Sequence, residues 1–292
     1  MSPAPDGVVL IGHGSRDVAT AREFLTLATA VAHQPVLGGV VVEPGFLEFA
    51  GGMVPSIEDA FARCVARGAQ RVAAVPAILF AGGHGTRDLP SELDLVRQRF
   101  PGVDVRLAEL IGIDDRLLDQ LVVRVDIATA GLSRVPAADT AVLLVTSGSA
   151  HREANADVFK AARLLADRAG GRWVEVAFLR LSRPYLQDAA HRCARLGARR
   201  IVVVPLFVNI GLLARRVPRK LVWLRQQLPS VELVEVPHLG VDPVLVELLA
   251  QRALEAFEAA TDPIRTPVRL SPGQERCRPP YIPSLAVAAA GA

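Results

Sequence analysis

The sequence predicts an α/β fold of two similar lobes, each a four-stranded parallel sheet flanked by helices. Two observations indicate this. A stretch of the first half recurs in the second half, and in both halves short apolar, β-branched runs alternate with helical segments. Strands that are apolar almost throughout are typical of parallel sheets, which are covered on both faces. Alternating strands and helices in turn imply crossover connections within each sheet.

The repeat is clearest where segment 63–72 (RCVARGAQRV) reappears as segment 192–201 (RCARLGARRI). Each copy runs on to a proline, Pro76 in the first and Pro205 in the second. The offset between copies is larger upstream and slightly smaller downstream, so the first half carries a small insertion, which we place at residues 51–54. Self-similarity of this kind is the signature of a duplicated domain.

Four strands are expected in each half. The predicted strands are residues 8–11, 40–42, 72–75 and 103–107, then 142–145, 174–178, 201–204 and 231–236. Segments 57–67 and 185–196 have helical periodicity and end at Gly68 and Gly197, residues that commonly stop a helix.

The chain divides into four predicted segments. Residues 1–132 form an N-terminal lobe with a metal site, and residues 133–140, rich in Ser, Pro, Ala and Asp, form a linker. Residues 141–261 form a second lobe that lacks the metal ligands. Residues 262–292 are a Pro-rich tail that we expect to be disordered.

Composition excludes several classes of protein. A net charge of +3 with 5% aromatic residues does not favour nucleic-acid binding. Three scattered cysteines fit neither a disulfide framework nor a cysteine metal site. The first residues lack a signal-peptide pattern, and the longest apolar run, 201–214, is too short to span a bilayer. We therefore expect a cytoplasmic protein that does not bind membranes.

Two histidines lie among glycines just beyond predicted strands. His13 follows the first strand in Gly-His-Gly-Ser, and His84 follows the third in Gly-Gly-His-Gly. Ligands of open parallel sheets bind at the carboxyl ends of strands. Adjacent strands are about 5 Å apart, so two neutral imidazoles there could bind one metal ion. Glu48, beyond the second strand, could bring a carboxylate to the same edge.

Other interpretations of these residues stay open. A Gly-His-Gly sequence is often only a turn, and Glu48 could be a surface carboxylate. Asp17 and Asp88 could cap the helices that follow them. His238, near the end of a strand in the second half, could line the cleft or be structural.

Comparison of the two copies of the repeat tests whether the candidate ligands have a structural or a functional role. Alignment of the halves sets Ser147, Arg180 and Leu213 opposite His13, Glu48 and His84, so the second copy lacks all three candidate ligands. It carries instead a basic cluster after its third strand: Arg215, Arg216, Arg219 and Lys220. A metal site facing a cationic rim predicts a cleft for a metal and a polyanion, although the basic cluster could also be a solvated helix start.

Taken in order, the motifs resemble the sirohydrochlorin cobalt/iron chelatase family, the class II chelatases, in its long two-domain form. The motifs are residues 9–17 (VLIGHGSRD), 45–48 (GFLE), 55–57 (PSI), 75–84 (VPAILFAGGH) and 88–90 (DLP) with 112–114 (GID). The second half resembles the degenerate domain of that form through residues 147–149, 155–157 and 204–207. The resemblance covers about residues 6–258.

This resemblance implies an enzyme that inserts Fe²⁺ or Co²⁺ into sirohydrochlorin, with release of two protons, for siroheme or cobalamin biosynthesis. It implies that His13 and His84 bind the metal and help to remove pyrrole protons, with Glu48 as a third participant. It leaves iron and cobalt undecided, since His and Glu ligands suit both. The sequence departs from the family pattern at the insertion beside Glu48 and at Gly85-Thr86, where a basic residue is usual.

The substrate's carboxylates need hydrogen-bond donors and cations. The candidates are Ser15, Arg16, Arg87, Arg215, Arg216, Arg219 and Lys220. No nucleotide is required, and because two lobes are fused we expect a monomer to hold one complete cleft.

Three other functions have sequence requirements that can be compared with this chain. A non-catalytic tetrapyrrole or metal carrier could use the same residues. A histidine phosphatase would need an arginine where Gly12 lies, and a flavodoxin-like module would need a phosphate loop that neither half has.

Overall fold

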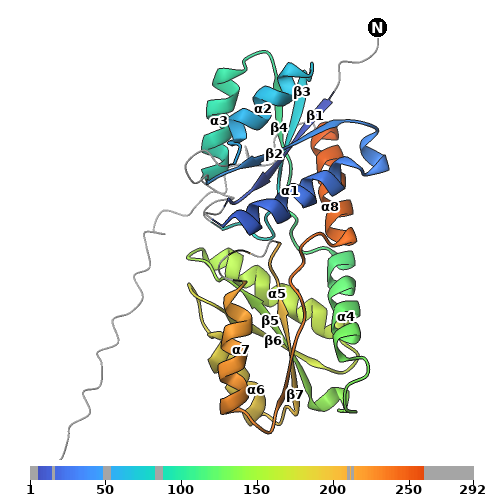
Figure 1. The fold of residues 1–292 in the computed structure, drawn as a ribbon, viewed down its shortest axis with the longest axis vertical. Coiled ribbons are helices and arrows are strands. Elements are labelled where there is room, and N and C mark those ends of the chain that lie inside the picture. The colour runs from blue at the N-terminus through green and yellow to red at the C-terminus, as the bar shows by residue number, and fades with distance from the viewer. Residues whose placement is uncertain are drawn as a thin grey trace, which may run out of the picture.

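A computed structural model describes residues 6–14, 17–48, 54–82, 88–208, 211 and 214–259. The described chain forms two four-stranded parallel sheets, in the orders β2-β1-β3-β4 and β6-β5-β7-β8, which lie one above the other in Figure 1. The predicted fold class is confirmed. The strands are β1 (Asp6–Gly12), β2 (Val41–Phe46), β3 (Arg71–Pro76), β4 (Asp104–Leu107), β5 (Thr140–Thr146), β6 (Trp173–Phe178), β7 (Arg200–Pro205) and β8 (Glu232–Glu235).

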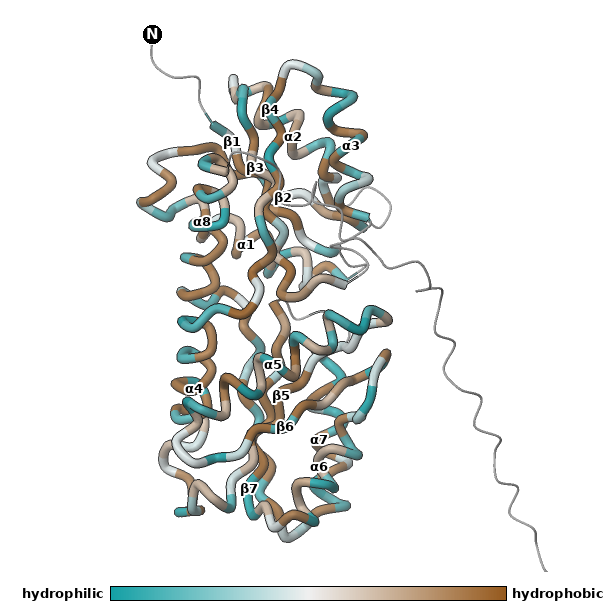
Figure 2. Tube along the Cα trace, turned by 180° about the vertical axis from the view of Figure 1, so that it is seen from behind, coloured by the Kyte–Doolittle hydropathy of each residue, from teal (hydrophilic) through white to brown (hydrophobic). Residues whose placement is uncertain are grey.

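Helices cover both faces of each sheet. They are α1 (Val18–Ala32), α2 (Ile57–Ala66), α3 (Leu89–Arg99), α4 (Asp115–Thr129), α5 (Arg152–Arg168), α6 (Leu186–Arg195), α7 (Arg216–Gln227) and α8 (Pro243–Glu258), with short 3-10 turns at Pro35–Leu37 and Ala137–Asp139. Successive residues of β1 are buried in different clusters, Leu10 on the α1 side and Ile11 on the α2 side. This explains the continuous apolar runs, which are brown along the strands in Figure 2.

Most strands extend one or two residues beyond the predicted runs, and β2 extends furthest. The apolar run at residues 40–42 was expected to be the whole second strand, but β2 continues through Glu43, Pro44 and Gly45 to Phe46. Proline is tolerated because β2 is an edge strand that pairs only with β1. Gly45 is needed because a side chain there would come within 3.0 Å of the Ile57 backbone on α2.

The predicted helix ends are confirmed in both halves. Helix α2 begins at a capping box between Ser56 and Asp59 and is followed by Gly68 at φ 92°. Helix α6 is likewise followed by Gly197 at φ 100°. A left-handed glycine at this point satisfies the last carbonyls of a helix without a Cβ clash.

The insertion in the first half is confirmed by the different lengths of matching segments in the two lobes. Phe46 bridges to Ser56 in the first lobe, ten residues on, whereas Phe178 bridges to Tyr185 in the second, seven residues on. The first lobe therefore carries three extra residues between its second strand and the next helix, in the stretch that contains 51–54. Most of that stretch lies outside the described residues, as does the tail from residue 260.

The last helix of each half packs against the sheet of the other lobe. Helix α4 packs against α5, β7 and β8, and α8 packs against α1, β3 and β4 (Figure 1). One apolar cluster consequently runs through both lobes, containing Leu10 and Leu27 of the first with Leu144 and Leu165 of the second. The predicted segments 1–132 and 141–261 are thus interlocked in space rather than set side by side.

An arginine at the same strand position anchors the last turn of α8 in one lobe and the chain just after α4 in the other. Arg71 opens β3 and donates to Phe257 O at 3.4 Å, with its guanidinium 4.8 Å from the Phe257 ring. Arg200 is the first residue of β7 and donates to Ser133 O at 2.6 Å.

No helix of the described residues is long and apolar enough to cross a membrane.

Candidate metal centre

Three neighbouring strands direct the candidate ligand loops to one edge of the first sheet. Because β1 lies between β2 and β3, the chain segments beyond all three begin side by side. Leu47 N donates to Gly12 O at 3.0 Å, and Glu48 N donates to His13 O at 2.9 Å. On the other side, Ala77 N donates to Ile11 O at 2.8 Å. The sequence expectation that the first three strands are neighbours is therefore correct.

His13 and Glu48 are adjacent at this edge. Their backbones share a hydrogen bond, and both side chains are exposed rather than packed into the core. An imidazole and a carboxylate at one solvent-accessible point can bind a divalent ion and can also accept protons.

Gly14 allows this close approach. Its φ is +91°, and a Cβ there would lie 1.7 Å from Glu48 O. Only glycine fits, both because of its left-handed backbone and because the second loop passes directly over it. The glycine after His13 therefore holds the two candidate ligand loops against each other.

His84 lies outside the described residues, in the segment 83–87 with Arg87, and Ser15 and Arg16 lie outside them too. Among the residues that are described, no three His, Cys, Asp or Glu side chains gather as a metal site requires. The described chain breaks off at Gly82, six residues after β3, which pairs with β1, and resumes at Asp88, just before α3. The proposal that His84 joins His13 and Glu48 rests on this strand order.

The second lobe repeats the loop geometry with other residues. Leu179 N donates to Thr146 O at 2.9 Å and Arg180 N donates to Ser147 O at 3.1 Å, the counterparts of the bonds made by Leu47 and Glu48. Gly148 also has a positive φ, +78°, where Gly14 has +91°. The alignment of Ser147 with His13 and of Arg180 with Glu48 is confirmed, whereas Leu213 lies outside the described residues.

The two sets of strand ends face each other across the lobes. A Cβ on Gly82, beyond β3, would lie 3.4 Å from Ser149 Oγ, beyond β5. Asn155 fixes that second-lobe loop, accepting from Ser149 N at 2.9 Å and donating to Ser149 O at 2.8 Å. The candidate metal edge therefore opens toward the second lobe.

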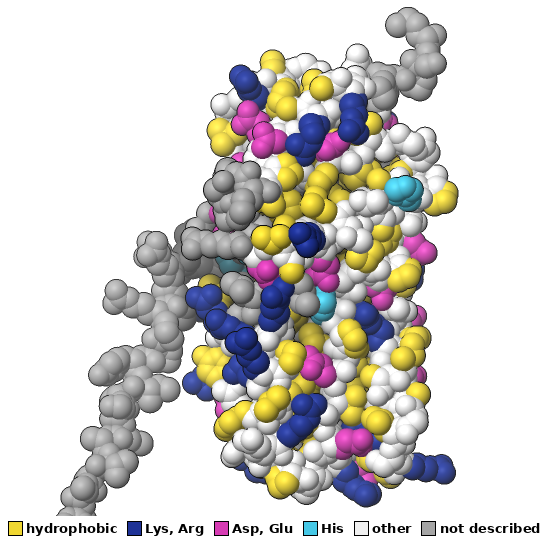
Figure 3. Space-filling view, viewed as in Figure 1, with side chains coloured by type: hydrophobic (Ala, Val, Ile, Leu, Met, Phe, Trp, Pro, Cys, Tyr) yellow, Lys and Arg dark blue, Asp and Glu magenta, His cyan; other side chains and the backbone are white. Residues whose placement is uncertain are grey.

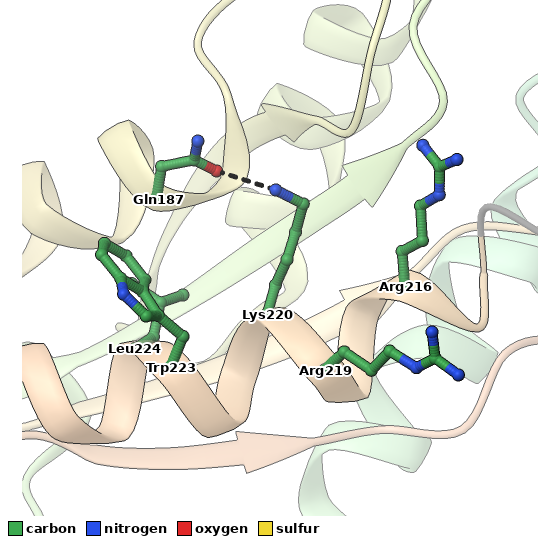
Figure 4. Close-up of a pocket in the computed structure, with 6 residues that line it drawn as sticks. All are labelled: Gln187, Arg216, Arg219, Lys220, Trp223 and Leu224. Carbon is green, nitrogen blue, oxygen red and sulfur yellow. Dashed lines mark hydrogen bonds between the residues drawn. The ribbon is translucent and has the colours of Figure 1, made fainter.

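The basic cluster divides into two parts. Arg215 reaches across to the first lobe, where Nη2 lies 2.7 Å from Asp17 Oδ2. The others, Arg216, Arg219 and Lys220, line a pocket of ≈ 480 Å³ together with Gln187, Trp223 and Leu224 (Figure 4). Sequence reasoning did not single out the last three residues or the partner of Arg215. A basic first turn without any acidic residue was the signal for this pocket.

Asp17, Asp88 and His238 each had more than one possible role, and the structure distinguishes these roles. Asp17 caps α1, accepting from Ala19 N at 3.1 Å, whereas Asp88 makes no capping bond from its side chain. His238 lies between the lobes, with Nε2 2.6 Å from Glu23 Oε1. It ties the second lobe to α1 and does not join the described candidate ligands.

The buried cysteines are poor metal ligands. Desolvation raises the pKa of both the Cys64 and the Cys193 thiol to about 12. Both therefore stay protonated at neutral pH, and a thiol must lose its proton to bind a metal. They occupy equivalent core positions, on α2 and α6, in the two lobes.

Comparison with known proteins agrees with this architecture. The CbiX family model matches the chain twice, at residues 7–128 and 141–256. The chain belongs to the CbiX family. The two matches fall on the two halves of the repeat, so the duplication is one of a whole family unit.

Curated relatives of this CbiX-family chain are chelatases by name. It is 31% identical over 252 residues to the sirohydrochlorin cobaltochelatase of Priestia megaterium, covering 86% of this chain and 80% of the relative. It is 28% identical over 247 residues to the sirohydrochlorin ferrochelatase of the same organism, covering 85% and 89%. Among solved structures, SirB from Bacillus subtilis with Fe³⁺ superimposes with a TM-score of 0.72 at 28% identity, covering 86% of this chain and 95% of SirB.

Proposed function

We propose that this protein is a sirohydrochlorin chelatase: it inserts Fe²⁺ or Co²⁺ into sirohydrochlorin and releases two protons. The observation that carries the proposal is the adjacency of His13 and Glu48 at a strand edge that opens toward the second lobe. The names of the relatives, which cover both iron and cobalt, support the same reaction. The product would serve siroheme or cobalamin biosynthesis.

In this proposal His13 and His84 hold the metal through neutral imidazole nitrogens. Such ligands leave coordination positions open for the pyrrole nitrogens of the substrate. Once the metal has passed to the pyrrole nitrogens, the imidazole nitrogen that held it would be free to accept one pyrrole proton, and Glu48, whose backbone N–H bonds to His13 O, could accept or relay the second. The reaction needs no nucleotide.

The substrate's carboxylates are assigned to the polar residues around the cleft. Ser15, Arg16 and Arg87 belong to the first-lobe loops, and the basic cluster belongs to the second lobe. Arg215 already binds a carboxylate, that of Asp17, so a substrate carboxylate that binds Arg215 replaces a contact between the lobes. We further propose that one chain, acting as a cytoplasmic monomer, supplies one complete cleft.

Turnover tests the proposal against its alternative, a tetrapyrrole or metal carrier. Purified protein is mixed with a large excess of sirohydrochlorin and Co²⁺ under anaerobic conditions, and the absorbance change is followed. An enzyme converts many equivalents faster than the uncatalysed reaction, whereas a carrier stops at one equivalent. His13→Ala and His84→Ala should each lower the rate by about 10²- to 10⁴-fold. A double variant with normal rates contradicts the proposal.

A further inference from the structure

The pocket between α6 and α7 lies on the flank of the second lobe. We call it the α6–α7 pocket, formed by Gln187, Arg216, Arg219, Lys220, Trp223 and Leu224. Figure 4 shows Lys220 reaching across to Gln187, where Nζ donates to Oε1 at 3.2 Å. The guanidinium groups of Arg216 and Arg219 lie toward the N-terminal end of α7, and the Trp223 ring lies toward the other end.

The pocket starts near the seam between the lobes, where the proposed cleft would lie. Arg216 follows Arg215, which pairs with Asp17 just beyond the His13 loop. From Arg216 to Trp223 the helix advances by about 10 Å. Figure 3 shows Lys and Arg side chains gathered over the N-terminal end of α7, beside the seam between the lobes. The α6–α7 pocket therefore extends outward from the cleft rather than lying inside it.

The charges of this pocket are uncompensated within the described chain. No described acidic side chain forms an ion pair with Arg216 or Arg219, whereas Arg215 next to them is paired. The first turn of α7 has no acidic residue. Cations at the N-terminal end of a helix oppose its macrodipole, so their clustering there is unfavourable without an anion.

An aromatic surface completes the pocket. The side chain of Trp223 is 48% exposed, a high value for the largest apolar residue, while Leu224 beside it is buried. Indole rings stack on flat π systems. Arginines provide paired donors that match carboxylate geometry. The pocket therefore combines recognition of a planar ring with recognition of carboxylates.

The fold itself does not require these residues. Helices α3 and α7 end in the same way, at Phe100 bonded to Val96 O and at Leu228 bonded to Leu224 O, which fixes their alignment. In this alignment the first lobe has acidic or neutral residues where the second has the pocket. They are Asp88, Ser91, Glu92 and Leu95, opposite Arg216, Arg219, Lys220 and Trp223 respectively; in the repeat of segments 63–72 and 192–201, Glu58 lies opposite Gln187. A solvated helix surface would satisfy the fold equally well with either set.

We propose that the α6–α7 pocket is an outer docking site for a planar polycarboxylate, where sirohydrochlorin binds before it enters the cleft. A face of the tetrapyrrole ring stacks on Trp223, and the carboxylates bind Arg216, Arg219 and Lys220. This inference rests on the proposed function for the identity of its ligand. A positive site at the mouth of a cleft also raises the association rate of an anionic substrate.

Binding kinetics test the docking site. Association of metal-free sirohydrochlorin is followed by stopped-flow absorbance at low and high salt, for the wild type, Arg216→Gln/Arg219→Gln, Trp223→Ala and Trp223→Phe. Arg195→Gln is the matched control, an exposed arginine at the end of α6 that is not part of the pocket. The arginine double variant should associate about tenfold more slowly at low salt and lose most of its salt dependence. Trp223→Ala should weaken binding, and Trp223→Phe should restore most of it.

Steady-state insertion of Co²⁺ gives the second readout. The KM for sirohydrochlorin should rise several-fold in the pocket variants, by more than kcat falls, with the KM for Co²⁺ unaltered. If the association rate and the KM are unaltered in the pocket variants, the docking site is wrong. The proposed function still stands in that case, provided that His13→Ala loses insertion. If the wild type binds sirohydrochlorin through the pocket but never turns over, the proposed function fails and the docking site stands. Binding of an acidic peptide in place of sirohydrochlorin overturns the inference.

Discussion

The two lobes share one backbone plan and differ in the chemistry they carry at it. In both, the residue two positions beyond the second strand donates its N–H to the residue after the first strand, and a glycine with positive φ follows. At those positions the first lobe has His13 and Glu48, and the second has Ser147 and Arg180. Since the geometry survives without the histidine and the carboxylate, the fold does not need them. Their presence in the first lobe alone supports the proposed metal site there.

The equivalent glycines offer the strongest test of this difference. Gly14→Ala places a Cβ 1.7 Å from Glu48 O, which forces the two candidate ligand loops apart. Gly148→Ala also has an unfavourable φ, but its Cβ meets Ser182 N at 2.9 Å, away from the proposed ligands. Both should lower the free energy of unfolding, by about 1 to 3 kcal/mol. Only Gly14→Ala should lower metal insertion by more than about tenfold.

Urea unfolding and the insertion rate, measured on the same preparations, separate the two effects. Equal losses of insertion in the two glycine variants would mean that the metal site is not confined to the first lobe.

The two anchoring arginines should also differ, but here the larger effect is expected in the second lobe. The side chain of Arg200 is 6% exposed and binds Glu232 and Ser133, whereas that of Arg71 is 41% exposed and binds Asp6. Arg200→Met should lower the free energy of unfolding by about 2 to 3 kcal/mol, because it leaves charged and polar partners unsatisfied. Arg71→Met should cost at most about 1 kcal/mol. Thermal denaturation measures both, and a larger effect for Arg71 would show that the second lobe is not the more rigidly anchored one.

The buried cysteines should behave alike. The pKa of each thiol is about 12 in the fold, above the value of about 8.5 for an unfolded chain. Their contribution to stability is therefore complete below about pH 8.5 and is lost as the pH rises toward 12, since only the unfolded chain then releases the protons. The slope should be on the order of 1 kcal/mol per pH unit for each thiol.

Urea midpoints between pH 7.5 and 10.5 measure this loss, and the slope should flatten in Cys64→Ala and in Cys193→Ala. Peptide mapping after iodoacetamide treatment at pH 8 should find Cys64 and Cys193 unmodified in the native protein. Modification of one and not the other would reveal a difference in core packing that the repeat does not predict.

Much of the fold could be predicted from the sequence because the repeat shows the same pattern twice. Apolar runs located the strands, and Gly68 and Gly197 located helix ends. The placement of His13 and Glu48 at one edge followed from their positions just beyond predicted parallel strands. The extent of β2 did not follow, because Pro44 and Gly45 interrupt a strand pattern and are tolerated only at an edge next to α2.

What the sequence could not show are contacts between distant segments. Nothing in the periodicity of α4 or α8 says which lobe each will cover, since both present ordinary apolar faces. The pairing of Arg215 with Asp17 joins residues far apart in the chain, and so does the pairing of His238 with Glu23. Trp223 lines one pocket with Gln187 of another helix, which Lys220 joins by a hydrogen bond.

The central claim is that each chain has one metal site and that it belongs to the first lobe. Anaerobic isothermal titration with Co²⁺ tests this most directly, comparing the wild type with His13→Ser, which introduces the residue type found at the matching second-lobe position, and with Ser147→Ala as its control. One equivalent should bind to the wild type and to Ser147→Ala, and binding should be lost or at least about tenfold weaker in His13→Ser. Two equivalents in the wild type, or full binding in His13→Ser, would contradict the account.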